Sequence, residues 1–485
     1  MVRRLNPRYL AAAALVFGAT FFVRTFVLWQ DGALMYQTHA DECIYYASTM
    51  AFWQGSMPYT DFIHLHPPGI LAVLTPFVAI GSVFTESTGM FLARMGFVAL
   101  AALNAVIVTT LIWRYGRIAA VGAGLFYASW NVVAIPEGNV QLVTIVNTMF
   151  LFAALLLQRW PKRTLLAGLF IGFACATKVW AVVFVPVFVP YIWAKHGRAA
   201  AFRFLAGVAA MVTVVCGPFA IIDPGAAWKS VVTEQLGRPS EFPPFNVVLN
   251  MFVSGGSSET STLGALFVAA VLVAIASPLV VALASRSHPR EWSDAAWLAM
   301  VVVVQLTMLF TAPVFYKPYA AFVGPQVALL WGGLLVLTMR HLRAATLVAV
   351  PVIAGAALTT ISGTQFTAVD RPKLVDATSG YDCIWTLNAS YLVESDTMSR
   401  NLAHGCGFQI DGYGFHMINS KDDRRSEAWQ REVQGQLEKA DAVVMGPLES
   451  WYLDETNRDY IRANFHNDVK FEASFFDIRE RKPAR

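Results

Sequence analysis

The chain has 485 residues, of which 56% are hydrophobic and only 14% charged, and its mean hydropathy is +0.51. Soluble domains carry about 25% charged residues, so this composition excludes an ordinary soluble protein. The net charge of +4 is too small to indicate nucleic-acid binding. Apolar runs long enough to cross a hydrocarbon core of roughly 30 Å recur before residue 363, which predicts a polytopic α-helical membrane protein.

Short loops rich in Lys and Arg set the predicted topology, because such loops stay on the cytoplasmic side. Placing every such loop inside predicts about eleven transmembrane helices in a bacterial inner membrane protein, with a cytoplasmic N-terminus. The first helix is interpreted as retained, since no clear cleavage site follows it. The apolar segment 70–84 is interpreted as embedded without crossing. The predicted spans are 9–29, 90–112, 117–135, 140–158, 164–177, 179–194, 201–222, 263–285, 293–312, 319–338 and 343–362.

The predicted outer loop 31–89 opens with two adjacent carboxylates, Asp41 and Glu42. They begin a segment, 41–54, in which four apolar side chains recur at helical spacing: Cys43, Tyr46, Met50 and Trp53. This pattern predicts a short amphipathic helix that lies in the membrane interface. Asp41 and Glu42 are the candidate catalytic residues, with Glu42 holding the acceptor or orienting Asp41. Because a helix dipole favours acidic residues at its N-terminus, the alternative for Asp41 is only a cap.

Two histidines in the same loop, His64 and His66, precede the stiff turn Pro67-Pro68-Gly69. On an extended segment both side chains could face one way. Imidazoles placed there could bind a lipid phosphate, or hold a divalent metal ion together with Asp41. The alternative is a pair of polar interfacial residues. A metal is possible but not required, and no other cofactor is expected.

Ionisable residues inside predicted spans are costly and usually have a partner or a ligand. Lys178 lies between two short apolar spans, and Glu137 follows Pro136 at the outer end of a helix. Both are candidates for substrate binding, and a structural ion pair is the alternative. Arg24 and Arg94 lie near the outer ends of their spans and are interpreted as snorkelling side chains.

Two further outer loops carry candidate phosphate-binding residues. Gln235 and Arg238 are about one helical turn apart in the second loop, and Arg suits bidentate phosphate binding. Three more candidates lie in a short outer turn: Tyr316, Lys317 and Tyr319. The alternatives are a solvated loop charge and interfacial anchors. Carboxylates beside cations suit a reaction that deprotonates a hydroxyl and expels an anionic phosphate.

The order of motifs in the first outer loop resembles the opening of GT-C superfamily glycosyltransferases. The motifs are Asp41-Glu42, Tyr45-Tyr46, Pro58-Tyr-x-Asp-Phe62 and His66-Pro-Pro-Gly69. The chain looks most like the protein mannosyltransferase and aminoarabinose transferase types and their bacterial envelope relatives, over roughly residues 1–340. The resemblance implies a polyprenyl phosphate sugar as donor, used on the outer face, with Asp41 as general base. Such relatives often have Lys where this chain has His66, which directs attention to Lys178 and Arg238.

The expected activity is therefore inverting transfer of a sugar, mannose or arabinofuranose, to an envelope polysaccharide, a glycolipid or a protein hydroxyl. The expected partners are the lipid-linked donor, the acceptor and membrane lipids, with no nucleic acid. Two alternatives remain open. One is a transporter of polyprenyl-linked lipids, although no inverted repeat of broken helices is visible. The other is a noncatalytic superfamily member that acts as a scaffold.

Two domains are expected: a transmembrane domain, 1–362, and a small extracytoplasmic α+β domain, 363–485. Strands are predicted at 440–446 and 469–478, and helices at 423–439 and 454–465. Cys383 and Cys406 fall in this oxidising setting, so a disulfide is expected between them. The remaining cysteines show no metal-binding spacing.

Overall fold

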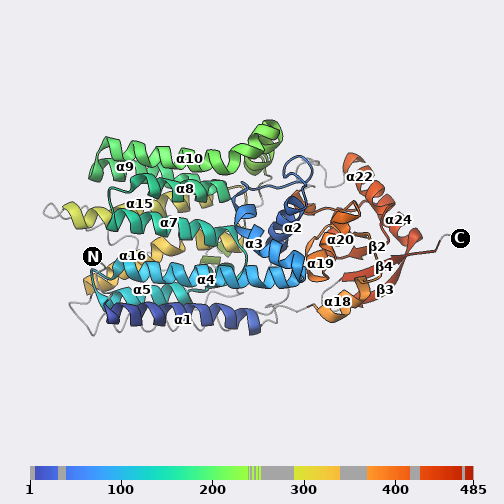
Figure 1. Ribbon diagram of the computed structural model, residues 1–485, viewed down its shortest axis with the longest axis horizontal. Coiled ribbons are helices and arrows are strands. Elements are labelled where there is room, and N and C mark those ends of the chain that lie inside the picture. Colours follow the sequence, from blue (N-terminus) through green and yellow to red (C-terminus); the bar gives the residue numbers. More distant parts are fainter. Residues whose placement is uncertain are drawn as a thin grey trace. The chain divides into compact units, whose positions relative to one another are not determined.

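The computed structural model describes residues 6–30, 40–238, 240, 243–244, 247–248, 251–252, 289–338, 369–414, 427–471 and 476–483. Figure 1 labels the helices and strands of the chain, which divides into two compact units. Unit 1 comprises Met1–Leu28, Met95–Val215 and Ser240–Thr364. Unit 2 comprises Trp29–Arg94, Cys216–Pro239 and Gln365–Arg485. This division differs from the expected boundary at residue 363, which stays a prediction.

Unit 1 is built from long apolar helices. Those that it contains, wholly or for the most part, are α1 (Pro7–Gln30), α4 (Glu86–Ile112), α5 (Arg117–Ser129), α6 (Asn131–Gly138), α7 (Leu142–Arg159), α8 (Thr164–Thr177), η1 (Val179–Phe184), α9 (Val185–His196), α10 (Arg198–Ile222), α15 (Pro289–Thr311), η3 (Lys317–Val323) and α16 (Gly324–Thr338). Its core gathers aromatic side chains; the rings of Phe150 and Phe184, for example, lie 5.0 Å apart. A Cβ on Gly168 would lie 2.1 Å from the carbonyl oxygen of Phe204, so α8 and α10 meet at a glycine contact typical of membrane helices.

Among the described residues, seven helices are long and apolar enough to cross a membrane, or eight if α5 and α6 form one span. That pair is bent by 61° between Ser129 and Asn131, so the segment predicted as one span at 117–135 consists of two helices. The predicted spans 263–285 and 343–362 lie outside the described residues. The segment interpreted as non-crossing is α3 (Gly69–Val83), whose 15 residues fall short of the roughly 20 that a span needs.

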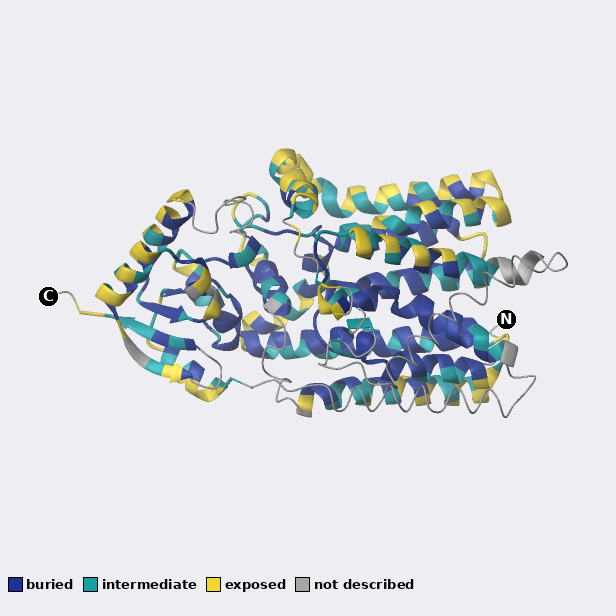
Figure 2. Ribbon diagram, turned by 180° about the vertical axis from the view of Figure 1, so that it is seen from behind, coloured by how far each residue is buried: buried dark blue, intermediate teal, exposed yellow. Residues whose placement is uncertain are grey.

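The outer surfaces of several long helices are apolar. On α10 the side chains of Phe202, Val214 and Ile221 are all exposed, and Figure 2 shows the exposed faces in yellow. Large apolar surfaces of this kind are unfavourable in water but suit contact with lipid chains. The protein is therefore a multi-pass membrane protein.

Unit 2 begins with α2 (Ala40–Trp53), whose extent matches the predicted helix 41–54. The single apolar stripe expected for it is wrong, because the helix is buried on nearly all sides. Tyr46 and Met50 are buried, but so are Ser48 and Thr49, whereas Trp53 is exposed. The hydroxyl of Tyr46 lies where a Cβ on Gly81 or Gly89 would be, so α2 packs closely against α3 and the start of α4.

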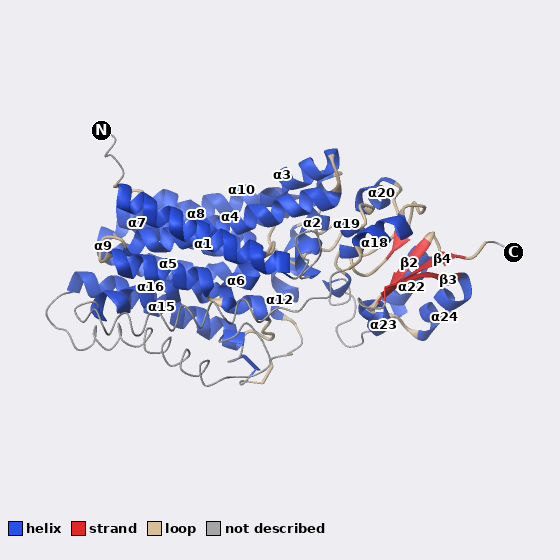
Figure 3. Cartoon of the chain, turned by 90° about the horizontal axis from the view of Figure 1, so that it is seen from below, coloured by secondary structure: helices blue, strands red, loops and turns tan. Residues whose placement is uncertain are grey.

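The C-terminal part of unit 2 holds a four-stranded sheet in the order β1-β2-β4-β3, drawn in red in Figure 3. The strands are β1 (Ile384–Trp385), β2 (Ala442–Met445), β3 (Phe465–Phe471) and β4 (Phe476–Arg481). The second predicted strand, 469–478, is wrong, since an antiparallel pair, β3 and β4, occupies it. The helices are α18 (Arg371–Thr378), α19 (Ser390–Glu394), α20 (Met398–Ala403), α22 (Glu427–Leu437), α23 (Pro447–Tyr452) and α24 (Glu455–Asn464).

The core of this sheet draws on distant parts of the chain. Trp385, Val443 and Trp429 bring β1, β2 and α22 together, and Ile63 of the first outer loop packs against the same cluster. The predicted helices 423–439 and 454–465 correspond to α22 and α24. The expected disulfide is confirmed: Cys383 and Cys406 are bonded, with their Cα atoms 5.3 Å apart.

Candidate active site

Asp41 and Glu42 occupy the first turn of α2, but their surroundings differ. Glu42 is fully buried, and Arg94 donates to both of its oxygens, from Nε to Oε2 at 3.1 Å and from Nη2 to Oε1 at 2.7 Å. Asp41 is only partly buried. Of the two carboxylates predicted to be catalytic, Asp41 is thus the one that solvent reaches.

The interpretation of Arg94 as a snorkelling side chain is wrong. Its guanidinium is buried and forms a bidentate pair with Glu42, which ties the start of α2 to α4. A fork of two parallel N–H donors matches a carboxylate in geometry as well as in charge. Removing one partner of such a pair leaves the other charge buried without a counter-charge, which lowers the free energy of unfolding by about 3–5 kcal/mol.

The motifs Pro58–Phe62 and His66–Gly69 form one structure. Tyr59 has a positive φ of 74°, and its peptide closes a turn in which its N–H donates to the carbonyl oxygen of Phe62 at 2.9 Å. The Tyr59 hydroxyl then donates to the carbonyl oxygen of His66 at 2.7 Å. Because a positive φ is uncommon for a non-glycine residue, this turn is specified by the contacts around it.

His64 and His66 lie together, as the extended segment predicted, with ring centroids 6.2 Å apart. His64 is 2% exposed, and burial lowers its pKa to about 4. It is therefore neutral at pH 7 and cannot supply a positive charge to a phosphate. His66 is less buried, and its Nε2 lies 3.4 Å from the hydroxyl of Tyr45.

Sequence reasoning missed a second carboxylate, Asp411. It stands in the turn Asp411-Gly-Tyr-Gly414, where its Oδ1 accepts a hydrogen bond from the N–H of Gly414 at 2.8 Å. A Cβ on Gly412 would lie 2.5 Å from the carbonyl oxygen of Leu387, and one on Gly414 would lie 2.5 Å from Asp411 Oδ2. The two glycines were a visible signal of a tight turn, but nothing in the sequence linked that turn to Asp41.

This turn meets the other loops of unit 2. Gly414 lies close to Leu65, whose carbonyl oxygen accepts a hydrogen bond from Gln235 Nε2 at 2.9 Å. The guanidinium carbon of Arg238 lies 5.6 Å from the ring centre of Tyr413. Gln235 therefore holds the backbone of the first outer loop, while Arg238 stands beside the Asp411 turn.

The charges of Asp41 and Arg238 both act on Asp411. Burial raises the pKa of Asp411 to about 6, and the negative charge of Asp41 adds to the rise. The hydrogen bond from the Gly414 N–H and the positive charge of Arg238 both lower this pKa. A nearby like charge favours the neutral form of a carboxyl, so the charge of Asp41 reaches the turn beside which Arg238 lies. We call Asp41, Arg238, Asp411 and Tyr413 the Asp41 cluster.

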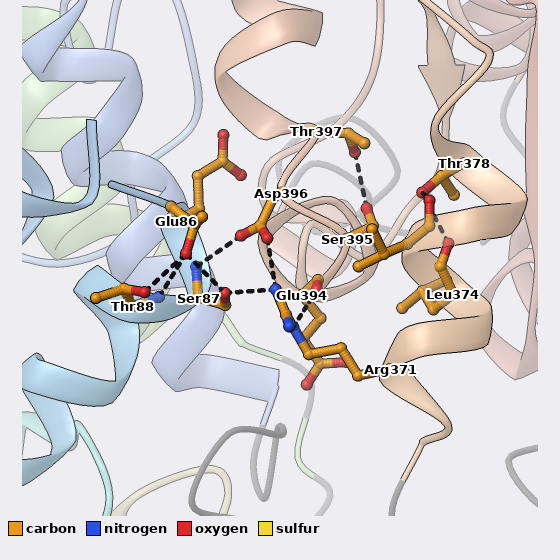
Figure 4. Close-up of polar contacts among 12 residues, drawn as sticks. Glu86, Ser87, Thr88, Arg371, Leu374, Thr378, Glu394, Ser395, Asp396 and Thr397 are labelled. Carbon is orange, nitrogen blue, oxygen red and sulfur yellow. Dashed lines mark hydrogen bonds and ion pairs between the residues drawn. The ribbon is translucent and has the colours of Figure 1, made fainter. Parts of the chain in front are cut away.

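A polar network fixes the C-terminal segment to the start of α4 within unit 2 (Figure 4). Arg371 pairs with Asp396 and donates to the hydroxyl of Ser87 at 2.6 Å, while the N–H of Ser87 donates to Asp396 at 2.9 Å. Glu86 accepts hydrogen bonds from the N–H groups of Met398 at 2.9 Å and Ser399 at 2.6 Å. These contacts hold the segment that leads to Asp411.

In unit 1, the predicted binding residue Glu137 is surrounded by protein. Arg24 Nη2 donates to its Oε2 at 3.1 Å, and both side chains are fully buried. Its Oε1 accepts from the amides of Asn104 and Asn147, each at 3.2 Å, and from the hydroxyl of Tyr127. We call these five residues the Glu137 network. The snorkelling interpretation of Arg24 is wrong, and both oxygens of Glu137 are occupied.

Lys178 stands in extended backbone at the break between α8 and η1. Its Nζ lies 4.3 Å from the ring centre of Trp180 and 5.1 Å from that of Tyr319. Tyr319 in turn lies 5.4 Å from Tyr316, ring to ring. Unit 1 thus brings three of the predicted binding residues together, whereas Lys317 is an exposed side chain at the start of η3.

Within the described ranges, no group of three or more His, Cys, Asp or Glu side chains is placed to hold a metal ion. The interpretation of His64, His66 and Asp41 as metal ligands therefore has no geometric support there. The chemistry that the Asp41 cluster can perform is proton transfer at a carboxylate beside a fixed positive charge.

Solved structures share this fold along nearly the whole chain. ArnT from Cupriavidus metallidurans bound to undecaprenyl phosphate aligns with a TM-score of 0.59 at 13% identity, covering 97% of each chain. An oligosaccharyltransferase from Archaeoglobus fulgidus, in complex with zinc and sulfate, aligns with a TM-score of 0.55 at 10% identity, covering 96% of this chain and 72% of that one. At such identities the likeness shows the fold alone.

Comparisons of sequence match a smaller part of the chain than the comparisons of structure do. No curated protein sequence matches the chain. The family model described as Glycosyltransferase family 87 matches residues 62–313, which is more than half of the 485 residues. The expected resemblance to GT-C enzymes is confirmed: the chain belongs to glycosyltransferase family 87, a membrane glycosyltransferase family of the GT-C type.

Proposed function

We propose that the protein transfers a sugar from a polyprenyl phosphate-linked donor to an acceptor hydroxyl, with Asp41 as the general base. The observation that carries the proposal is the Asp41 cluster, in which the partly exposed Asp41 raises the pKa of a second carboxylate, Asp411, and the Arg238 guanidinium lowers it. The undecaprenyl phosphate bound to the structurally similar ArnT supports this class of donor.

In the proposed reaction, Asp41 accepts the proton of the acceptor hydroxyl as its oxygen attacks the anomeric carbon. The bond between that carbon and the phosphate oxygen breaks, and polyprenyl phosphate leaves with the electron pair. A single in-line displacement inverts the configuration. General base catalysis of this kind contributes roughly 10²–10⁴-fold to the rate.

The leaving phosphate requires positive charge that is already in place, since such charge costs no reorganisation during the reaction. Arg238 is the candidate within the Asp41 cluster. Lys178 of unit 1 is a second candidate. Tyr316, Lys317 and Tyr319, which the sequence places in a separate outer turn, stay proposed binding residues. His66 can contribute a hydrogen bond, whereas the neutral His64 is better suited to supporting the loop.

Glu42 acts in this proposal as a positioning residue. Both of its oxygens are bonded to Arg94, so it fixes the first turn of α2 and with it the backbone of Asp41. Asp411 and Tyr413 are proposed to hold the acceptor, because the charge of Asp41 acts on Asp411 and Tyr413 lies in the same turn, by Arg238. Glu137 is proposed to stabilise the helix bundle instead of contacting substrate.

The finer assignments follow from the sequence. Mannose and arabinofuranose are the proposed sugars, and an envelope polysaccharide, a glycolipid or a protein hydroxyl is the proposed acceptor. The reaction is placed on the outer face of a bacterial inner membrane, with residues 363–485 extracytoplasmic and the N-terminus cytoplasmic. A divalent metal is not required, because the leaving group is a monophosphate that one or two cations can balance.

The test uses purified protein in liposomes, a panel of radiolabelled polyprenyl phosphate sugars and a crude envelope acceptor. Wild type is compared with Asp41→Asn, and Asp376→Asn is the matched control because Asp376 is an exposed side chain of α18. We expect transfer by wild type and control, and a loss of roughly 10²–10⁴-fold in Asp41→Asn. Transfer retained by Asp41→Asn would refute the assignment of the base. Labelled lipid that moves between leaflets without any transfer would instead identify a transporter.

A further inference from the structure

Unit 1 contains a cavity of about 250 Å³ at the end of the bundle where α4, α7 and α9 end. One part of its lining is apolar and includes Leu111, Leu157 and Trp297. The other part is polar and includes Arg114, Lys195 and Asp294. An amphipathic lining of this kind suits a ligand with a charged head and an apolar stem.

The polar side carries a surplus of positive charge. One carboxylate, Asp294, forms ion pairs with two cations. Its Oδ1 pairs with Lys195, and its Oδ2 lies 3.6 Å from Arg114 Nη2. The hydroxyl of Tyr191 also donates to Asp294 Oδ1 at 2.7 Å. The side chain of Arg114 is 50% exposed, so the surplus charge is accessible from outside the cavity.

The aromatic residues around this cavity are of the kind that occurs at the level of lipid headgroups. Tyr191 stacks on Trp297 with ring centres 4.5 Å apart, and Lys195 Nζ lies 4.8 Å from the ring centre of Tyr191. The Arg114 guanidinium lies 4.5 Å from the ring centre of Tyr115. Trp and Tyr concentrate at membrane–water interfaces, and the loops at this end are the basic ones predicted to be cytoplasmic.

We propose that this cavity binds the phosphate headgroup of an anionic phospholipid from the surrounding leaflet. The phosphate oxygens accept charge-assisted hydrogen bonds from Arg114 and Lys195, and the first carbons of the lipid contact Leu111 and Leu157. Basic pockets between transmembrane helices on the cytoplasmic side suit such headgroups. The cavity is smaller than the roughly 300–1,000 Å³ of a drug-sized ligand site, so it holds the headgroup and leaves the chains outside. The site is independent of the proposed transfer reaction.

The test measures lipid binding to the full-length protein by native mass spectrometry, titrating phosphatidylglycerol or phosphatidylcholine. The variant Arg114→Ala/Lys195→Ala removes the cavity cations. The matched control, Arg117→Ala/Lys162→Ala, removes the same net charge from exposed residues near the same helix ends. We expect the cavity variant to lose about tenfold or more in affinity for phosphatidylglycerol, and the control no more than about twofold. Equal losses in both variants would mean diffuse attraction and would overturn the site.

A second variant separates binding from structural damage. Asp294→Asn leaves both cations in place and removes the competing carboxylate, so affinity for phosphatidylglycerol should rise several-fold. A fall in this variant, or equal binding of phosphatidylcholine by wild type, would overturn the proposal. Inorganic phosphate at about 10 mM is the third arm: if it displaces phosphatidylglycerol fully, the site takes free phosphate compounds and the lipid assignment is wrong.

Discussion

Glu137 in unit 1 and Asp41 in unit 2 are both carboxylates that the sequence marks as candidates for chemistry, and their surroundings are opposite. Glu137 is fully buried, with Arg24 on one oxygen and three neutral donors on the other. Asp41 is partly exposed and acts on a second carboxylate, Asp411, that Arg238 also faces. A buried carboxylate whose oxygens are all bonded to protein stabilises the fold, whereas one that solvent reaches beside a like charge is available for proton transfer.

The largest effect on stability is expected from Glu137→Ala. The substitution leaves Arg24 buried without its carboxylate, which should lower the free energy of unfolding by about 3–5 kcal/mol. Thermal unfolding in detergent measures the loss, and Asp376→Asn serves as a control. If Glu137→Ala instead kept the melting temperature of the wild type and lost transfer, Glu137 would contact substrate and the contrast with Asp41 would fail.

Removing the disulfide should destabilise unit 2, which contains the Asp41 cluster, and leave the Glu137 network of unit 1 unchanged. Replacing Cys383 and Cys406 together by Ala opens a loop that spans 23 positions and should cost unit 2 about 3 kcal/mol by the loop-entropy model. Because Cys406 precedes Asp411 by only five residues, transfer should fall as well. Limited proteolysis and transfer assays measure both effects, with Cys175→Ala as control. Two free thiols found in this segment by a peptide map of the wild type would contradict the bridge.

The raised pKa of Asp411 predicts a pH-dependent difference in stability. Because burial raises this pKa from 3.8 to about 6, the folded protein holds the proton more tightly than the unfolded chain does. The stability that Asp411 contributes is present at low pH and is lost as the pH rises from about 4 through about 6. Asp411→Asn does not ionise, so it should become more stable than wild type by about 1–3 kcal/mol over that range. Melting temperatures at several pH values test this; a difference that is constant with pH would show that the carboxyl is not buried.

The smallest expected effect comes from the glycine that supports the Asp411 turn. Gly414→Ala places a Cβ 2.5 Å from Asp411 Oδ2 and 3.0 Å from Leu65, so the carboxylate must shift. We expect transfer to fall about tenfold and the free energy of unfolding to fall by about 1 kcal/mol, the low end of the cost of overpacking, because only one carboxylate must shift. Gly435→Ala is the matched control, because its Cβ would meet open space. Equal activity of both variants would remove Asp411 from the site.

Much of the fold could be predicted because the hydropathy pattern of a helix is visible in a short run of neighbouring residues. Nine of the eleven predicted spans fall on described helices, and the start of α2 lies within one residue of its predicted position, because apolar runs and helical spacing are properties of neighbouring residues. The single predicted strand 469–478 overlaps both β3 and β4, because alternating apolar residues occur in each and their antiparallel pairing is a tertiary contact. The bend between α5 and α6 also left no clear mark in the sequence.

The candidate site was predictable only in part. Asp41 stood out as an acidic residue at a helix start, and the resemblance to GT-C enzymes strengthened it. Glu42 and Arg94 are separated by 52 positions and Arg24 and Glu137 by 113, so no local pattern reveals that each pair is joined. The burial of α2 on almost every side likewise depends on distant elements, among them α3 and α19.

Local chemistry along the chain was thus enough to establish a multi-pass helical protein, its first catalytic candidate and its disulfide. Each of these rests on a run of neighbouring residues or on a setting shared by a whole segment. The folded arrangement was needed to tell structural carboxylates from available ones, to show that Asp41 and Arg238 both act on Asp411, and to show that His64 is neutral. These properties depend on burial and on charges far apart in sequence, and both arise only when the chain has folded.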